Sequence, residues 1–343
     1  MAGTPLLALL ALALGMSAAG ASHASPAKQV SVHDPVMAKQ GATWYLFSTG
    51  PGITFYSSSN MLDWKNEGRV FAGEPAWAKT AAPSFNGHIW APDIVYHGGK
   101  YYLYYSVSGF GKNTSGIGVT TNTTLDPRAP AYKWEDQGML LQSVPGRDNW
   151  NAIDANIIDD ASGTAWMSFG SFWSGLKLVK LDASRTRLAE PQVWHTIAAR
   201  DATVRAAGDT AGPGEIEAPH ILRKNGYYYL FASWGLCCNK EKTTYHVVMG
   251  RAKEVTGPYL DRLGKDMAKG GGSLLITGTP AWKGVGHNGA YTIDGKDLLV
   301  LHAYETADNY RQKLKVLEMT WDQDGWPAVD PADLDRYQSR QLD

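Results

Sequence analysis

The sequence lacks a long hydrophobic run beyond its N-terminus, and it lacks an excess of charge of either sign. No later segment reaches the roughly 20 apolar residues that a membrane-spanning helix needs, so we expect no membrane anchor. Lys and Arg number 32 and Asp and Glu 33, giving a net charge of −1. Because no basic surface is evident, we expect neither nucleic acid nor an anionic membrane as a partner, and a neutral ligand fits better.

The N-terminus is predicted to be a signal peptide. An apolar run from Leu6 to Leu14 is followed by small residues, and Ser22-His23-Ala24 forms a cleavage site. We therefore expect residues 1–24 to be removed and residues 25–343 to form one secreted domain, extracellular or periplasmic and monomeric. No Lys or Arg precedes the apolar run, so a disordered Ala-rich tail is the alternative.

Cysteine is scarce, and the two cysteines, Cys237 and Cys238, are adjacent. Neighbouring Cα atoms lie about 3.8 Å apart, which is below the usual range for a disulfide, so a bond between them is strained. An oxidising compartment nevertheless favours the bond. Two thiols and one vicinal disulfide both remain open.

Helical periodicity is also scarce, and a repeat takes its place. The sequence has 37 Gly and 17 Pro, and turn signals separate short strand-like runs, which is typical of an all-β fold. Short polar anchors recur at intervals of about 60 to 70 residues: His33-Asp34-Pro35, Ala91-Pro92-Asp93, Ile153-Asp154-Ala155-Asn156, Glu217-Ala218-Pro219-His220 and Gly286-His287-Asn288.

Each anchor is followed by a run rich in aromatic and β-branched residues, at 43–49, 100–107, 164–172, 226–234 and 297–304. Segments 62–71, 132–141 and 257–264 are predicted to supply outer strands and their turns. Five such repeats predict a five-bladed β-propeller with four strands in each blade. A β-sandwich would not require a polar anchor in every repeat, and a scaffold of WD repeats has a shorter period, about 40–45 residues.

The innermost strand of each propeller blade lines a central channel, so the anchors are expected to converge there. Taken singly, an Asp before Pro is most often a turn former. Carboxylates gathered at one axis, however, repel one another and raise each other's pKa unless they perform acid–base chemistry or bind a cation. Glycoside hydrolysis needs such a set, with one group as acid and another as base or nucleophile. The candidates are Asp34, Asp154 and Glu217.

The sequence resembles the endo-α-1,5-L-arabinanases of glycoside hydrolase family 43. The matching segments, in the family's order, are VHDPV (32–36), residues 90–127, NAIDAN (151–156), FGSFWSGLKL (169–178), IEAPHI (216–221), residues 227–259 and GHN (286–288). The resemblance implies hydrolysis of internal α-1,5-L-arabinofuranosidic linkages of arabinan with inversion. It implies that Asp34 is the general base and Glu217 the general acid, while Asp154 orients Glu217 and keeps its pKa high.

The resemblance also implies a substrate face and a metal position. Sugar contacts are expected from Asp34, Trp90, Phe110, Gly111, Asn151, Asp154, Ser171, Phe172 and Trp173. For Trp90 and Phe110, packing between blades is the alternative. His287 is expected to help hold one hydrated calcium ion in the channel, and its alternative is a hydrogen bond to Asp or water. Asp93 is expected to be structural and to bond the backbone.

Two other functions remain open at this stage. The first is an exo-acting α-L-arabinofuranosidase or β-xylosidase with the same fold, which would have a closed pocket. The anchor spacings are similar and no long insertion is visible, which favours an open groove and internal cleavage. The second is a propeller that binds carbohydrate without catalysis.

Overall fold

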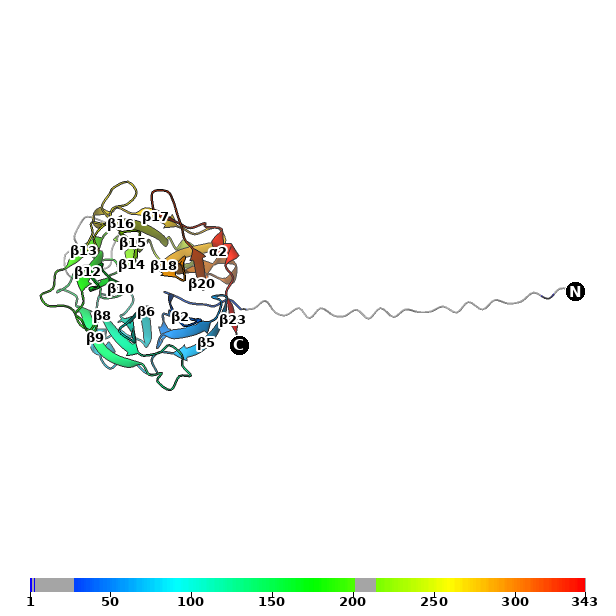
Figure 1. Cartoon of the computed structure of the whole chain (residues 1–343), viewed down its shortest axis with the longest axis horizontal. Helices are drawn as coiled ribbons and strands as arrows, with labels where there is room; N and C mark the ends of the chain where they lie inside the picture. Colours follow the sequence, from blue (N-terminus) through cyan, green and yellow to red (C-terminus); the bar gives the residue numbers. More distant parts are fainter. Residues whose placement is uncertain (2, 4–27, 201–213, 343) are drawn as a thin grey trace.

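A computed structural model describes Met1, Gly3, residues 28–200 and residues 214–342 of the chain. Apart from Met1 and Gly3, the predicted signal peptide lies outside the described residues. The β-sheets are arranged as blades around a central axis, in chain order (Figure 1). No helix among the described residues is long and apolar enough to span a membrane. The prediction of an all-β, five-bladed propeller is confirmed.

The first two blades are mainly antiparallel sheets that begin at the axis. Blade 1 contains β1 (Val36–Gln40), β2 (Thr43–Ser48), β4 (Thr54–Ser58) and β5 (Asp63–Arg69), with β23 (Arg340–Leu342) at its outer edge. Blade 2 contains β6 (His88–His97), β7 (Lys100–Val107), β8 (Ser115–Asn122) and β9 (Glu135–Ser143), with the short β3 (Gly50–Pro51) beside β6.

Blades 3 and 4 each have four strands. Blade 3 contains β10 (Asn156–Asp159), β11 (Ala165–Phe169), β12 (Leu176–Lys180) and β13 (His195–Ala198). Blade 4 contains β14 (Ile216–Lys224), β15 (Tyr227–Trp234), β16 (His246–Ala252) and β17 (Ser273–Ile276). Residues 257–264 do not form the outer strand of blade 4 as expected: Leu260 makes only isolated bridges, to Arg251 and Asp266.

Blade 5 has three strands in its sheet rather than the expected four. These are β18 (Trp282–Ile293), β19 (Lys296–Glu305) and β20 (Arg311–Glu318), while β21 (Thr320–Trp321) pairs with β22 (Pro327–Ala328). The helical segments are single turns: α1 (Ala78–Ala81), η1 (Lys240–Lys242), η2 (Met267–Lys269), η3 (Thr306–Asp308) and α2 (Asp333–Arg336).

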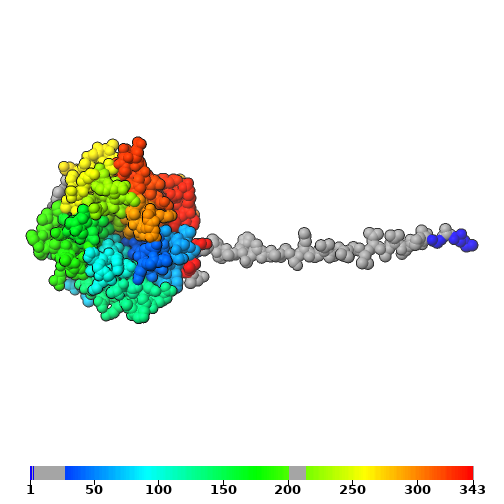
Figure 2. Space-filling view, in the orientation of Figure 1, coloured from blue at the N-terminus to red at the C-terminus, as the bar shows by residue number. Residues whose placement is uncertain are grey.

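The two ends of the described chain close the ring. The N–H of Leu314 in β20 donates to the carbonyl of Val30, so the first described segment borders the last blade. The C-terminal β23 pairs in parallel with β5 of blade 1. Figure 2 shows the blue first blade directly beside the orange and red last blade. Closure protects strand edges that would otherwise be open.

The hydrophobic core is divided into clusters that lie between neighbouring blades. Phe47 of blade 1 and Leu103 of blade 2, for example, share a cluster, and Leu46 of blade 1 shares another with Val300 of blade 5. The strand after each anchor is buried on both faces because it packs against both neighbouring blades. The apolar repeats of the sequence therefore build the ring.

The anchors share an unusual backbone conformation. Asp34, Ala91, Asp154, Ala218 and His287, one from each blade, all have positive φ between 42° and 61°. Such φ values are uncommon for residues other than glycine and often occur at functional sites. In blades 2, 4 and 5 the pairing register of the innermost strand shifts at this point. Of the residues at this position, Asp34, Asp154 and His287 line the cavity described below.

Candidate active site

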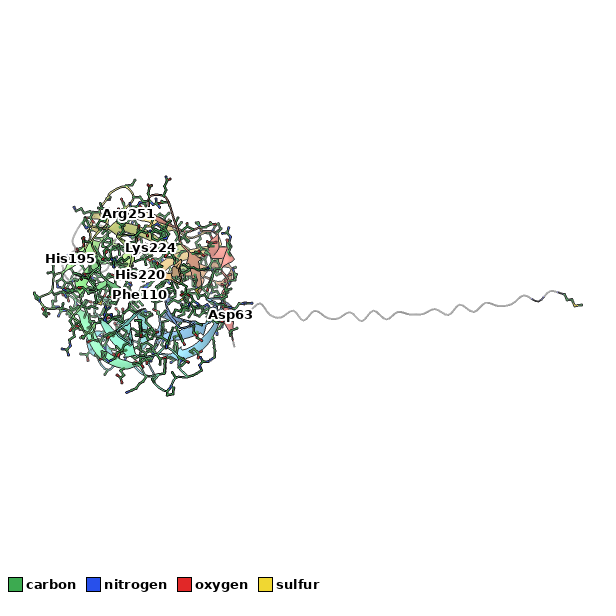
Figure 3. The ribbon with its side chains drawn as sticks, viewed as in Figure 1. Asp63, Phe110, His195, His220, Lys224 and Arg251 are labelled. Carbon is green, nitrogen blue, oxygen red and sulfur yellow. The ribbon has the colours of Figure 1, made fainter. Side chains whose placement is uncertain are left out.

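One cavity of about 460 Å³ opens over the axis, and residues from all five blades line it. Phe110 projects near the middle of the ring, whereas Asp63, His195 and Arg251 mark its outer rim (Figure 3). All the residues expected at the site line this cavity: Asp34, Trp90, Phe110, Gly111, Asn151, Asp154, Ser171, Phe172, Trp173, Glu217 and His287. The predicted convergence is therefore observed.

Asp34 lies in a dense set of hydrogen-bond donors. Its Oδ2 accepts from the hydroxyl of Thr49 at 2.5 Å. Its Oδ1 lies 2.7 Å from Nδ1 of His33 and 3.0 Å from Nδ1 of His287. Nδ1 of His302 accepts from the backbone N–H of Asp34 at 3.2 Å, so this nitrogen carries a lone pair rather than a proton.

These contacts keep Asp34 ionised. Burial by itself would raise the pKa of Asp34, but the charges and hydrogen bonds of His287 and His33 outweigh burial and lower the pKa well below its ordinary value. Conversely, burial would lower the pKa of His287, while the carboxylates of Asp34, Asp154 and Glu217 raise it to about 9. A carboxylate flanked by cationic imidazoles results at neutral pH.

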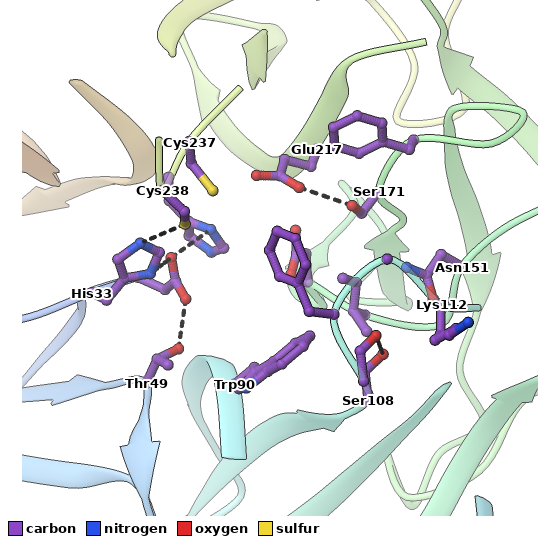
Figure 4. Close-up of a pocket in the computed structure, with 18 of the residues that line it drawn as sticks. His33, Thr49, Trp90, Ser108, Lys112, Asn151, Ser171, Glu217, Cys237 and Cys238 are labelled. Atoms are coloured by element: carbon purple, nitrogen blue, oxygen red, sulfur yellow. Dashed lines mark hydrogen bonds and ion pairs between the residues drawn. The ribbon is translucent and has the colours of Figure 1, made fainter. Parts of the chain in front are cut away.

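Glu217 is held from two sides. Tyr245 donates its hydroxyl to Oε1 at 2.7 Å, and Ser171 donates its hydroxyl to Oε2 at 2.8 Å. Figure 4 shows the contact between Ser171 and Glu217 across the cavity from Thr49, whose hydroxyl bonds Asp34. Asp34 and Asp154 are themselves the residues with positive φ in their anchors. In the anchor of Glu217 the residue with positive φ is the next one, Ala218. The two kinds of carboxylate therefore enter the cavity from different points of the repeat.

Asp154 is tied to the anchor that carries Glu217. Its Oδ2 accepts from the backbone N–H of Ala218 at 3.1 Å, and its own N–H donates to the hydroxyl of Ser106. Burial raises the pKa of Asp154 to about 8. The charge of His287 partly offsets this increase, and the charge of Glu217 adds to it. Burial likewise raises the pKa of Glu217, against the Tyr245 hydrogen bond. The pair retains a proton where an isolated carboxyl would be ionised.

Asp93 has the structural role that was expected of it. Its Oδ2 accepts from the N–H of Ile157 at 2.8 Å and from the side-chain amide of Asn156 at 3.3 Å. Asn156 in turn contacts Nδ1 of His220, whose Nε2 lies 2.9 Å from the carbonyl of Ala290. This network links blades 2, 3, 4 and 5 along the channel.

The channel below the active site suits a hydrated cation better than one held directly by protein ligands. Asp34 engages Nδ1 of His287, and in the cationic ring Nε2 carries a proton, so this nitrogen can bond a water molecule but cannot bind an ion directly. Among the described residues, no group of three candidate ligands includes His287. A cavity of about 20 Å³ adjoins His287, and both side-chain polar atoms of buried Asn288 lack a protein partner. Such a site fits ordered water, through which an ion would be held.

Aromatic side chains line part of the cavity. Phe110 is 83% exposed although it is a large apolar residue, so packing between blades does not explain it. Trp90 is partly buried and Trp173 is buried, and both line the cavity. Exposed aromatic faces of this kind suit the apolar faces of sugar rings.

Several residues that contact the carboxylates were not anticipated from the sequence. Thr49 ends the strand-like run of blade 1, and Tyr245 lies within segment 227–259, but neither belongs to a repeated anchor. His33 directly precedes Asp34 in the first anchor, and this position was the one sequence feature that could have indicated its contact with the carboxylate. Ser171 was expected to bind sugar, yet its hydroxyl bonds Glu217.

Cys237 and Cys238 also line the cavity, and both are free thiols. The Sγ of Cys238 lies 3.5 Å from Nε2 of His33. The hydrogen bond with Cys237 lowers the pKa of the Cys238 thiol to about 5, and the hydrogen bond with His33 contributes to the decrease. Together they outweigh burial, which by itself would raise this pKa. Of the two alternatives that the sequence left open, the structure contains the thiol pair.

Comparison with known proteins identifies the family of the chain. Residues 23–327 match the family described as glycosyl hydrolases family 43. An extracellular exo-α-(1→5)-L-arabinofuranosidase of Cellvibrio japonicus is 63% identical over 94% of this chain and 93% of its own length. An extracellular endo-α-(1→5)-L-arabinanase of Bacillus subtilis is 40% identical over 87% of each chain.

Solved structures show the same likeness. The α-L-arabinanase of Cellvibrio cellulosa in complex with arabinohexaose superposes with a TM-score of 0.90 at 63% identity, covering 92% of this chain and all of the other. An endo-arabinanase of Bacillus licheniformis superposes with a TM-score of 0.78 at 40% identity, covering 87% and 97%. The protein therefore belongs to glycoside hydrolase family 43.

Proposed function

We propose that the protein is a secreted enzyme that hydrolyses α-1,5-L-arabinofuranosidic linkages of arabinan with inversion at the anomeric carbon. The observation that carries the proposal is the contrast between two parts of one cavity. Asp34 is held ionised, whereas the Glu217–Asp154 pair is held protonated. Two carboxyl groups in opposite protonation states are what acid–base glycoside hydrolysis requires. The family, and the names of its 63% and 40% identical relatives, support arabinan as substrate and secretion as location.

In this proposal Asp34 is the general base. Its carboxylate takes a proton from a water that attacks the anomeric carbon on the face away from the leaving group. Thr49 and the two histidines fix the orientation of the carboxylate. The same contacts lower its basicity, so the base depends on position more than on a high pKa.

Glu217 is the general acid, and it donates its proton to the glycosidic oxygen as the bond breaks. Tyr245 and Ser171 orient the carboxyl group. Burial, together with the repulsion between Glu217 and Asp154, keeps a proton on the pair at neutral pH. A hydrated calcium ion beside His287 would add positive charge near these groups.

The mode of attack is the finer part of the proposal. Even spacing of the anchors predicts internal cleavage, as for the arabinanase of Bacillus subtilis. The 63% identical relative is named as an exo-acting enzyme, and this observation favours release from a chain end as the second candidate.

Digestion of linear arabinan tests both parts. Internal cleavage gives a mixture of oligosaccharides in the first minutes with a rapid fall in viscosity, whereas terminal attack gives one short product while viscosity stays high. Proton NMR of the first products gives the anomeric configuration, and retention of configuration would overturn the inverting assignment. Hydrolysis of xylan-derived substrates in place of arabinan would point to a β-xylosidase, and binding of arabinan without any product would indicate a non-catalytic propeller.

A further inference from the structure

The proposed reaction does not use the two thiols in the wall of the active-site cavity. Cys237 and Cys238 follow β15, and they lie next to His33 on one side of the cavity (Figure 4). The ligand atoms of these three side chains all lie within 4.8 Å of one another. Two sulfur atoms and one imidazole nitrogen are a donor set typical of zinc and of softer divalent cations.

The distance between the sulfur and the nitrogen already suits a metal. Sγ of Cys238 lies 3.5 Å from Nε2 of His33. In a tetrahedral zinc site, bonds of about 2.3 Å to sulfur and about 2.0 Å to nitrogen hold those two atoms roughly 3.5 Å apart. Small side-chain rotations are therefore enough to bring His33 and Cys238 onto one ion.

The other nitrogen of His33 has the partner expected behind a metal-bound histidine. Nδ1 lies 2.7 Å from Oδ1 of Asp34, which leaves Nε2 as the nitrogen facing Cys238. Metal-binding histidines commonly donate their second nitrogen to a carboxylate, which fixes the ring orientation. The hydroxyl of Tyr304 lies 2.8 Å from Nε2 and 3.6 Å from Sγ of Cys238, so a bound ion would displace this hydroxyl from Nε2.

We propose that His33, Cys237 and Cys238 form a binding site for a thiophilic divalent cation, with Zn²⁺ as the representative ion and water as the fourth ligand. Binding releases the thiol proton of Cys237 and the Nε2 proton of the His33 ring to solvent, since Cys238 is already a thiolate, and it involves no oxidation. The ion and its water ligand lie in the wall of the cavity beside Asp34. Because Asp34 is the base of the proposed function, occupancy obstructs the approach of the attacking water and inhibits hydrolysis.

The test uses the full-length secreted enzyme, reduced and freed of metal. Titration with Cd²⁺ is followed by the ultraviolet absorption of thiolate-to-metal charge transfer, and titration with Zn²⁺ by calorimetry. We expect one ion per chain and a charge-transfer band in the wild type. Cys238→Ser should weaken binding at least tenfold and reduce the band. His195→Gln, which changes a histidine of β13 outside this cluster, should bind as the wild type does.

The readout separates this proposal from the proposed function, since absorption and calorimetry require no hydrolysis. Absence of the band, or an unchanged band in Cys238→Ser, overturns the site. Inhibition by Zn²⁺ that persists in Cys238→Ser places the inhibitory ion elsewhere and also overturns it. A thiol assay on the secreted protein before reduction gives a further check, because a result of no free thiols would show a vicinal disulfide in place of a metal site.

Discussion

Asp34 and His287, which belong to the first and last blades, meet at the axis with Oδ1 and Nδ1 3.0 Å apart. The contact is possible only because the ring closes, since 252 residues separate the two in the sequence. It places an ionised carboxylate beside a cationic imidazole. The predictions below follow from this arrangement and from the contacts of Glu217.

Asp34→Asn should abolish most of the activity while leaving the fold intact. The amide keeps the size of the side chain but cannot take a proton from water, so kcat on arabinan should fall by about 10³-fold. Asp297→Asn is a control for the loss of a buried carboxylate, because Asp297 is paired with Lys224 away from the cavity. This control should lower the melting temperature and retain kcat. A kcat for Asp34→Asn near that of the wild type would refute the base assignment.

Glu217→Gln should show a dependence on the leaving group. The variant cannot protonate a sugar leaving group, so its kcat on arabinan should fall by about 10³-fold. On an aryl arabino-oligosaccharide with an acidic phenol, which departs without protonation, the loss should be much smaller. Both substrates are measured with the same enzyme preparation, and the ratio of their kcat values in the wild type is the control. Equal losses on the two substrates would contradict the role of Glu217 as general acid.

Asp154 should set the alkaline limit of activity. The acid must be protonated, so kcat/KM falls as pH rises through the raised pKa of the Glu217–Asp154 pair; the value for Asp154 is about 8. Asp34 must be ionised, and its lowered pKa places the acidic limit below the ordinary range of a carboxyl group. Asp154→Asn removes a negative charge beside Glu217, so the alkaline limit should move to lower pH. A shift to higher pH would exclude this role.

Tyr245→Phe should move the alkaline limit the other way. The Tyr245 hydroxyl donates to Oε1 of Glu217 and favours the ionised carboxylate. Without that donor the pKa of Glu217 rises, so the pH profile of kcat/KM should extend to higher pH. The ring remains in place to pack against Gly286. An unchanged profile would show that the hydroxyl does not act on Glu217.

Calcium binding at His287 is a separate prediction. Atomic spectroscopy of the dialysed protein should find one calcium ion per chain, with less in His287→Ala and in Asn288→Ala. Added calcium should raise the melting temperature of the wild type, and a hundredfold excess over Kd corresponds to about 2.7 kcal/mol. EDTA should reverse the increase. Calcium content that is equal in all three proteins would remove His287 and Asn288 from the site.

The sequence by itself determined the architecture, because a propeller repeats one local pattern. Apolar runs such as 100–107 specify strands buried on both sides, and their recurrence after each anchor specifies the number of blades. The same repeat predicted that Asp34, Asp154 and Glu217 converge. Blade 5 was the exception, since its sheet has three strands rather than the expected four. The backbone hydrogen bond from Leu314 to Val30 joins this blade to the start of the described chain, and no local sequence pattern connects the two segments.

Only the tertiary structure decided which atoms meet at the site. The backbone is left-handed at Asp34 and Asp154, and at Ala218, which follows Glu217. The alternation of apolar and polar residues in a strand does not encode this conformation. The partners of the carboxylates, Tyr245 and Thr49, come from positions outside the repeat. Residue types therefore indicated the kind of chemistry, whereas the protonation state of each carboxyl group depends on distances of about 3 Å between blades, which arise only when the ring closes.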